Sequence, residues 1–308
     1  MADLQTTVTT PDGESAAPSS HEFGTAARKQ WQTILRRFVR HRLAMISLSV
    51  LGLIVLAALV IPLFWKYDHT YTGGRSFAPP SADHPLGTDQ IGRDMLALVV
   101  RGTQYSLLIA VVVAVMATVI GVTLGAVAGL LRGVVDTLVM RLVDLMLIVP
   151  QLALVAVASN AFGGSWYLVA IALGLFSWMQ VARINRGQTL SLSEREFVEA
   201  ARALGASNTR IVFSHILPNL TGIITVNATL AVATAVLAEA ALSFIGLGVQ
   251  LPDTSLGLVI NQNYSQFLTR PWLFWAPFTV IVLISLTINF IGDGLRDAFD
   301  PRQTKVRA

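Results

Sequence analysis

The chain has 308 residues, of which 54% are hydrophobic and only 13% are charged, and its net charge is +4. A soluble domain usually carries about 25% charged residues, so the composition excludes an ordinary water-soluble protein and favours a membrane protein. The absence of cysteine excludes disulfides, iron–sulfur clusters and zinc sites built from thiolates.

Residues 1–27 are predicted to form a disordered cytoplasmic tail. They are rich in Thr, Ser, Ala and Pro and lack the apolar core of a cleavable signal peptide. An inert tail and a regulatory one both fit. The lead that follows, residues 28–42 (RKQWQTILRRFVRHR), is strongly basic and is interpreted as an anchor on the membrane surface rather than a nucleic-acid arm.

Six membrane-spanning helices are predicted, since about 20 apolar residues suffice to cross a bilayer. The segments are 43–65, 102–131, two halves of 145–182, 220–245 and 271–292. The run 145–182 is too long for one span, and Gly163-Gly164 marks a turn that divides it. The first half is expected to begin near Leu138.

The distribution of Lys and Arg predicts that both ends of the chain lie in the cytoplasm. With both ends inside, 17 of the 22 basic residues fall in cytoplasmic segments. This bias is typical of membrane proteins, whose cytoplasmic loops are the more basic ones. The positive charge therefore reflects topology and does not indicate a nucleic-acid partner.

Motifs of common enzymes are missing from the sequence. No lysine is followed by Ser or Thr, so the chain has no GxxxxGK[ST] phosphate loop, and it has no HExxH or GxSxG motif. Tyr67-Asp68 matches half of an intramembrane aspartyl protease site, but no GxGD partner is present. An intramembrane enzyme remains the less favoured alternative from another functional class.

Polar residues before the second span allow two interpretations. Asp89, Arg93 and Asp94 are predicted either to support the fold, as part of a capped interfacial helix, or to contact a partner outside the membrane. Residues 246–270 are rich in Gly, Pro and Asn, and a short helix on the outer face is expected there.

Small and polar residues mark the interiors of two spans. Gly121, Gly125 and Gly129 form a small-residue ridge that is expected to pack against another helix. Glu239 and Asn227 in the fifth span are candidates for the translocation path, because an ionisable or polar group inside a membrane is costly without water or a partner. Hydrogen bonding within the bundle is the alternative for both.

Residues 194–219 (EREFVEAARALGASNTRIVFSHILPN) form the longest predicted cytoplasmic loop. Four residues recur at helical spacing and predict one face of a short helix: Phe197, Ala200, Ala201 and Leu204. This helix is either an amphipathic surface helix lying on the lipid headgroups or a docking element for a cytoplasmic partner.

A glycine and a proline divide the rest of this loop. Gly205 is expected to end the first helix, and Ser207 or Asn208 can cap a second one over residues 209–217. Pro218 is then predicted to mark the bend into the fifth span.

The spacing within this loop resembles the EAA loop of binding-protein-dependent ABC permeases. The matching residues are Glu199, Ala200, Ala201, Gly205, Leu217 and Pro218. His215 stands where the general pattern often has Ile, and the sequence HILPN is similar to the peptide-importer branch.

Three further motifs extend the resemblance over residues 30–303, and the chain is similar to the C-type permease subunit of dipeptide and oligopeptide ABC importers. They are HPLGTDQIGRD (84–94) with RGTQYSL (101–107), LAEAALSFIGLGVQLP (237–252) and INFIGDGLRDAFDPR (288–302). One departure is Leu256-Gly257, where the family often has Trp-Gly.

The resemblance implies an all-α polytopic membrane protein with the six-helix fold of a type I ABC importer permease in the bacterial cytoplasmic membrane. It divides the chain into the tail 1–27, the lead with the first span and outer loop (28–105), the permease core (106–296) with the EAA loop at 185–220, and a C-terminal tail (297–308).

The resemblance also implies partners and a mechanism. The expected partners are a second homologous permease, two ABC ATPase subunits, an extracytoplasmic substrate-binding lipoprotein and membrane lipid. ATP and Mg²⁺ are bound by the ATPases, and this chain is expected to hold no cofactor, metal or catalytic residue. The EAA loop would couple ATP hydrolysis to alternating access. The solute is expected to be a di- or oligopeptide, while nickel, haem and opine importers use similar permeases.

Overall fold

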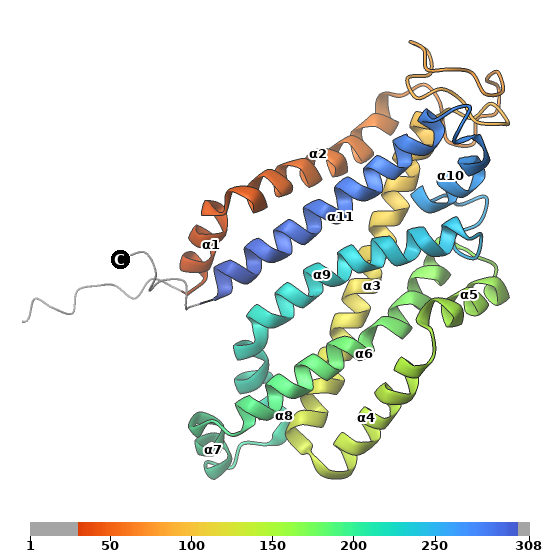
Figure 1. The fold of residues 1–308 in the computed structure, drawn as a ribbon. Coiled ribbons are helices and arrows are strands. Elements are labelled where there is room, and N and C mark those ends of the chain that lie inside the picture. The colour runs from red at the N-terminus through yellow and green to blue at the C-terminus, as the bar shows by residue number, and fades with distance from the viewer. Residues whose placement is uncertain (1–29, 301–308) are drawn as a thin grey trace, which may run out of the picture.

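A computed structural model describes residues 30–300, and over this range the protein is helical with irregular connections and one isolated bridge between Thr88 and Asp94. Figure 1 shows long helices side by side, with α7 and α8 at one end of the bundle and α10 at the other. The helices are α1 (Gln30–Arg40), α2 (Arg42–Phe64), α3 (Met95–Leu131), α4 (Gly133–Ile148), α5 (Gln151–Phe162), α6 (Trp166–Ser193), α7 (Glu196–Ala203), α8 (Asn208–Ile211), α9 (Leu217–Phe244), α10 (Leu256–Asn263) and α11 (Trp272–Phe299), with a π-helical turn over Val212–Ile216 and a 3₁₀ turn over Tyr264–Gln266. The predicted tail 1–27 lies outside the described residues, as does most of 297–308.

Five helical segments of the described range are long and apolar enough to cross a membrane: α2, α3, α6, the continuous run Asn208–Phe244 and α11. Helices α4 and α5 form a further candidate only as a pair, because the chain bends by 83° between them. The count of six spans and the orientation of both ends therefore stay predictions.

The third predicted span is not the single helix expected to start near Leu138, and that prediction was wrong. Helix α4 begins at Gly133, and the chain bends at Val149 and Pro150 before α5. Val149 has φ −82° and ψ 132°, the extended conformation that a following proline ring imposes. The turn predicted at Gly163-Gly164 is confirmed, since both residues have positive φ, at 91° and 63°.

Helix α3 is the central element of the bundle and is longer than predicted. It begins at Met95 rather than 102, because the Asp94 side chain accepts a hydrogen bond from the Ala97 backbone at 2.8 Å and caps the helix. The predicted span began only at residue 102, because that prediction rested on hydropathy and Arg101 is charged. The buried core gathers around α3, α6, α9 and α11, while many large apolar side chains of α2, α3 and α4 face outward, as expected of a surface in contact with lipid.

The predicted glycine ridge of α3 packs directly against α6. A Cβ atom added at Gly121, Gly125 or Gly129 would collide with Val181, Ala182 or Thr189, respectively. Because the colliding atoms at Gly125 belong to the α6 backbone, they cannot rotate away as a side chain could. The ridge therefore sets how closely the two helices approach.

We expect Gly125→Ala to lower the free energy of unfolding by about 1–3 kcal/mol, the usual cost of forcing extra volume into a packed interior. Gly52→Ala is the matched control, since a Cβ at Gly52 of α2 meets nothing within 4 Å. Alanine also favours a helix over glycine by about 1 kcal/mol, so the control should be neutral or stabilising. Thermal unfolding of the purified protein in detergent measures both, and equal midpoints for the two variants would contradict this packing role.

Candidate functional site

The loop over residues 194–219 folds as a short helix, a glycine turn and a second helix, as predicted. Helix α7 ends at Ala203, and Gly205 takes the left-handed conformation with φ 78°. The Gly205 backbone donates to the Arg202 carbonyl at 2.9 Å and the Ala206 backbone donates to the Ala201 carbonyl at 3.0 Å. These two bonds define a Schellman motif, the helix ending for which glycine is the preferred residue.

The second helix of the loop runs on into the fifth span. Ser207 caps α8, where its hydroxyl accepts from the Arg210 backbone at 3.4 Å. A π-helical turn then leads into α9 without a break in the helix. Leu217 and Pro218 lie at the start of α9. The wider π turn suits Pro218, which has no N–H and whose ring would press on the carbonyl four residues earlier in a regular helix. The second helix expected over residues 209–217 is thus present, but it is continuous with the fifth span and is not separated from it by a bend at Pro218.

A compact apolar cluster fixes this loop to the bundle. Val198 of α7 and Ile211 of α8 are fully buried, and they join side chains from the π turn, α9 and the C-terminal end of α3. The cluster, called the loop core below, consists of Ala126, Leu130, Val198, Ile211, Val212, Ile216 and Leu220. The loop core therefore packs α7 against the helical run that continues into α9 and against α3.

The exposed side of α7 and of the residue that ends it carries three of the four residues predicted to share one face. Of the four residues expected on one apolar face, Ala201 is buried, but Phe197 is 41% and Leu204 is 89% exposed. Ala200 and Glu199 are exposed beside them. Three of the four residues are therefore exposed, and only Ala201 turns inward. Val198 and Ala201 take the inner face, and Phe197 and Leu204 leave an apolar surface uncovered. Helix α7 lies at one end of the bundle (Figure 1).

Ion pairs between α4 and α6 were missed by the sequence analysis. Arg183 pairs with Asp144 at 2.6 Å, and Arg186 makes a bidentate contact with Asp136. Glu194, at the end of α6, pairs with Arg132 at 3.0 Å. Nothing in the local pattern relates residues about 40 to 60 positions apart, so only the fold could reveal these pairs.

Glu239 lies sealed inside the bundle and lines none of the larger cavities of the described chain. Its carboxylate accepts hydrogen bonds from Ser106 of α3 at 2.8 Å and from Ser243 of α9 at 2.7 Å. The two serine hydroxyls in turn accept from the Leu256 and Val249 backbones, at 3.2 and 3.0 Å. This geometry favours the second interpretation of Glu239, a hydrogen-bonded group within the bundle that holds the segment before α10.

Asn227 lies elsewhere on α9 and lines a cavity of 810 Å³ at the end of the bundle that holds α1 and the last turns of α11. Residues of α1, α6, α9 and α11 surround this cavity, including Trp31, Ile184 and Phe299. The amide nitrogen of Asn227 is buried and has no hydrogen-bond partner within the described chain. Asn227 thus borders a cavity, and its place on the translocation path stays a prediction.

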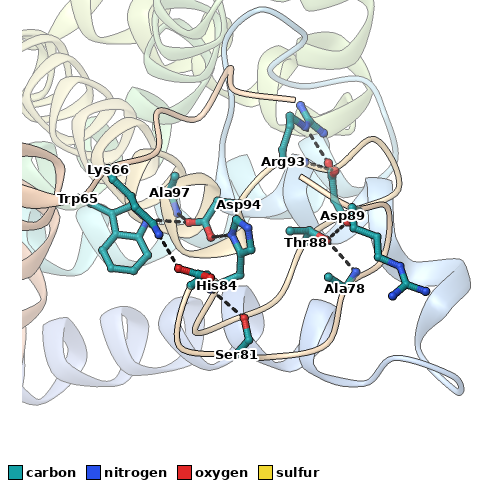
Figure 2. A network of polar contacts seen from close by, with 12 residues as sticks. Trp65, Lys66, Ala78, Ser81, His84, Thr88, Asp89, Arg93, Asp94 and Ala97 are labelled. Atoms are coloured by element: carbon teal, nitrogen blue, oxygen red, sulfur yellow. Dashed lines mark hydrogen bonds and ion pairs between the residues drawn. The ribbon is translucent and has the colours of Figure 1, made fainter. Parts of the chain in front are cut away.

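The segment between α2 and α3 holds a polar network that supports the fold (Figure 2). The buried Asp94 carboxylate contacts the His84 ring at 2.7 Å and accepts from the Trp65 indole at 2.9 Å, so it joins the end of α2 to the start of α3. Arg93 donates to Asp89 at 2.7 Å and to Gln262 of α10 at 2.7 Å.

Helix α10 confirms the short helix expected within residues 246–270. It does not lie on the outer surface, however, because Leu256 to Ile260 are buried in the bundle. Gly257 follows Leu256, which stands where the family often has Trp. Gly257 packs against the backbone of Ala240, where no side chain would fit.

Comparison with known proteins identifies the family. Residues 121–305 match the family described as binding-protein-dependent transport system inner membrane component. The chain belongs to this family. Residues 29–80 match the N-terminal transmembrane domain of oligopeptide transport permease C. The chain is therefore a multi-pass permease subunit of an ABC importer in the inner membrane.

Similar proteins extend over almost the whole chain. The oligopeptide transport system permease protein OppC of Mycobacterium tuberculosis (strain ATCC 25618 / H37Rv) is 42% identical, over 89% of this chain and 95% of that protein. OppC of Escherichia coli (strain K12) is 42% identical, over 94% and 97% respectively. OppC of Bacillus subtilis (strain 168) is 36% identical, over 95% and 97%.

A solved structure shares the fold. A chain of the MetNI methionine ABC transporter in an inward-facing conformation superposes with a TM-score of 0.55 at 22% identity. The match covers 67% of this chain and 98% of that chain. At this low identity the likeness concerns the fold alone.

We expect Gly205→Ala to destabilise the loop, because a left-handed residue with a Cβ costs about 1–2 kcal/mol. No atom lies within 4 Å of a Cβ built at Gly205, so the effect is conformational and not a clash. Gly205→Asn is the matched variant, since asparagine tolerates this conformation. Protease sensitivity of the loop in the purified protein distinguishes them. Equal cleavage of the two variants, both faster than wild type, would show that side-chain volume matters instead.

Proposed function

We propose that this permease carries di- or oligopeptides, and that it works with a second homologous permease, two ABC ATPase subunits and an extracytoplasmic substrate-binding lipoprotein. The peptide assignment is supported by relatives at about 42% identity that are named oligopeptide permeases. ATP and Mg²⁺ are bound by the ATPases in this proposal. The permease itself contributes the conformational change that moves the solute. Nothing observed in the chain favours nickel, haem or opine over peptides as that solute.

The observation that carries the mechanism is the exposed apolar face of α7, joined to α9 through the loop core. Phe197 and Leu204 offer an apolar contact to a cytoplasmic partner, and Glu199 beside them offers a carboxylate to a basic residue. A surface of this kind at the end of a rigid element suits the transfer of force from an ATPase. Closure of the ATPases would then move α7 and α9 together and switch the bundle between its inward and outward-facing states.

We further propose that the translocation path passes the cavity at Asn227. An extended peptide presents amide N–H and C=O groups in regular succession, and the unpartnered Asn227 amide can exchange hydrogen bonds with them. Glu239 acts at a distance from the path in this scheme and holds α10 and its preceding segment to α3.

The docking proposal predicts that Leu204→Glu releases the ATPases. An isolated charge forced into an apolar contact costs several kcal/mol, so ATPase recovery with the affinity-purified permease should fall at least tenfold. The second permease should remain bound, because Leu204 is 89% exposed and contributes little to this chain's own packing. Thr209→Glu is the control, since it adds the same charge to an exposed position of α8.

A second variant tests coupling apart from docking. Gly205→Asp adds bulk and charge at the turn, and we expect reconstituted importer to lose uptake of a labelled tripeptide while the permease still assembles. Normal uptake together with normal ATPase recovery in Leu204→Glu would overturn the docking and lever assignments. Failure to transport any peptide with a working complex would overturn only the solute.

A further inference from the structure

An apolar groove of 1090 Å³ opens between α2 and α3, with its floor on α9 and α11. Its lining follows α3 from Arg101 to Val119, a length of about 27 Å at 1.5 Å per residue. Most of the residues that face the groove are aliphatic. Arg101, Gln104 and Tyr105 gather at one end, on the first turns of α3, and the other polar residues of the lining are Thr118 and Thr229.

The Arg101 guanidinium at this end has no opposite charge near it. It donates to Gln104 at 2.7 Å and to the Tyr105 hydroxyl at 2.8 Å, and it lies 4.4 Å from the centre of the Tyr105 ring. Its Nε atom is buried and has no hydrogen-bond partner in the described chain. Among residues 30–300 no carboxylate comes within ion-pair distance of Arg101. A partly buried cation is costly unless an anion pairs with it, and residues 30–300 supply no such anion to Arg101.

A second, smaller cavity of 370 Å³ begins on the other side of Arg101. Arg101 and Gln104 line both cavities, so the two spaces meet at these side chains. The smaller cavity is polar, with Lys66, Tyr67 and Asp68 on its wall. Asp68 is ionised at neutral pH, because hydrogen bonds from Thr70 lower its pKa to about 2. The combined space is long and apolar on one side of a cation, and short and polar on the other.

We propose that this space binds a membrane phospholipid. Its phosphate lies against Arg101, its head group occupies the polar cavity, and an acyl chain follows the groove along α3. The sequence of a long apolar groove, a cation and a short polar cavity matches the acyl chain, phosphate and head group of such a molecule. Charge-assisted hydrogen bonds from an arginine to a phosphate are strong. A helix of another subunit would fill the groove equally well, but it would also have to place a carboxylate beside the Arg101 guanidinium to pair its charge. The proposal is independent of the solute that the importer carries.

The test uses the assembled importer in native membranes, with a photo-reactive benzoylphenylalanine in place of Leu108. Leu108 lines the groove and is 42% exposed. Leu53 of α2, which is 64% exposed and lies outside the groove, carries the same probe as the control. Mass spectrometry of the irradiated, detergent-washed protein identifies what is attached at each position.

We expect a phospholipid adduct at position 108. Arg101→Gln should reduce it about tenfold or more, because a lost charge-assisted hydrogen bond weakens binding by at least that factor. The adduct at position 53 should not change, and Arg101→Lys should preserve the adduct at 108. Val111→Trp fills the groove without altering Arg101 and should also remove the adduct, so the test does not depend on one variant.

Two results would overturn the proposal. Attachment of position 108 to a peptide of the second permease would show that the groove is a subunit interface. Phospholipid adducts that are equal at positions 108 and 53, and insensitive to Arg101→Gln, would show ordinary surrounding lipid with no site.

Discussion

The loop core is the packing interaction on which the proposed mechanism depends. Val198, Ile211 and Ile216 are fully buried, although they belong to a loop at the end of the bundle. Each such aliphatic side chain contributes about 1.5–3 kcal/mol when it is removed from water. Without this burial α7 would be a short, mobile helix, because helices of its length are not stable alone. With it, the exposed face of α7 is held to α9 and can transmit a push.

Helix α3 provides the frame against which that unit is held. At its C-terminal end it contributes Ala126 and Leu130 to the loop core, and the glycine ridge brings it close to α6. Toward its other end Ser106 binds the buried Glu239 carboxylate, and Asp94 ties its first turn to α2. Polar groups are thus satisfied inside the bundle at several depths, as a membrane interior requires.

Much of this arrangement could be predicted from local patterns. Apolar runs located the long helices, and the glycine turn at Gly205 followed from its place after a helical repeat. The bend at Pro150 and the continuous run from α8 into α9 were not predicted. A proline next to a helix can end it, bend it or be absorbed by a π turn, and tertiary packing decides among these outcomes. The sealed position of Glu239 likewise depends on Ser106, which lies 133 residues away. The family resemblance located the loop, but only the fold shows which face of α7 is free.

The central claim is that α7 and α9 move as one rigid unit, and a distance measurement within this chain tests it most directly. The chain has no cysteine, so Arg202→Cys on α7 and Leu237→Cys on α9 can be spin-labelled without removing others in this subunit. Both positions are exposed. Double electron–electron resonance on the assembled importer, with and without ATP, would give the distance between the labels. The account predicts the same distance in both states, and a shifted or broadened distance after ATP binding would contradict it.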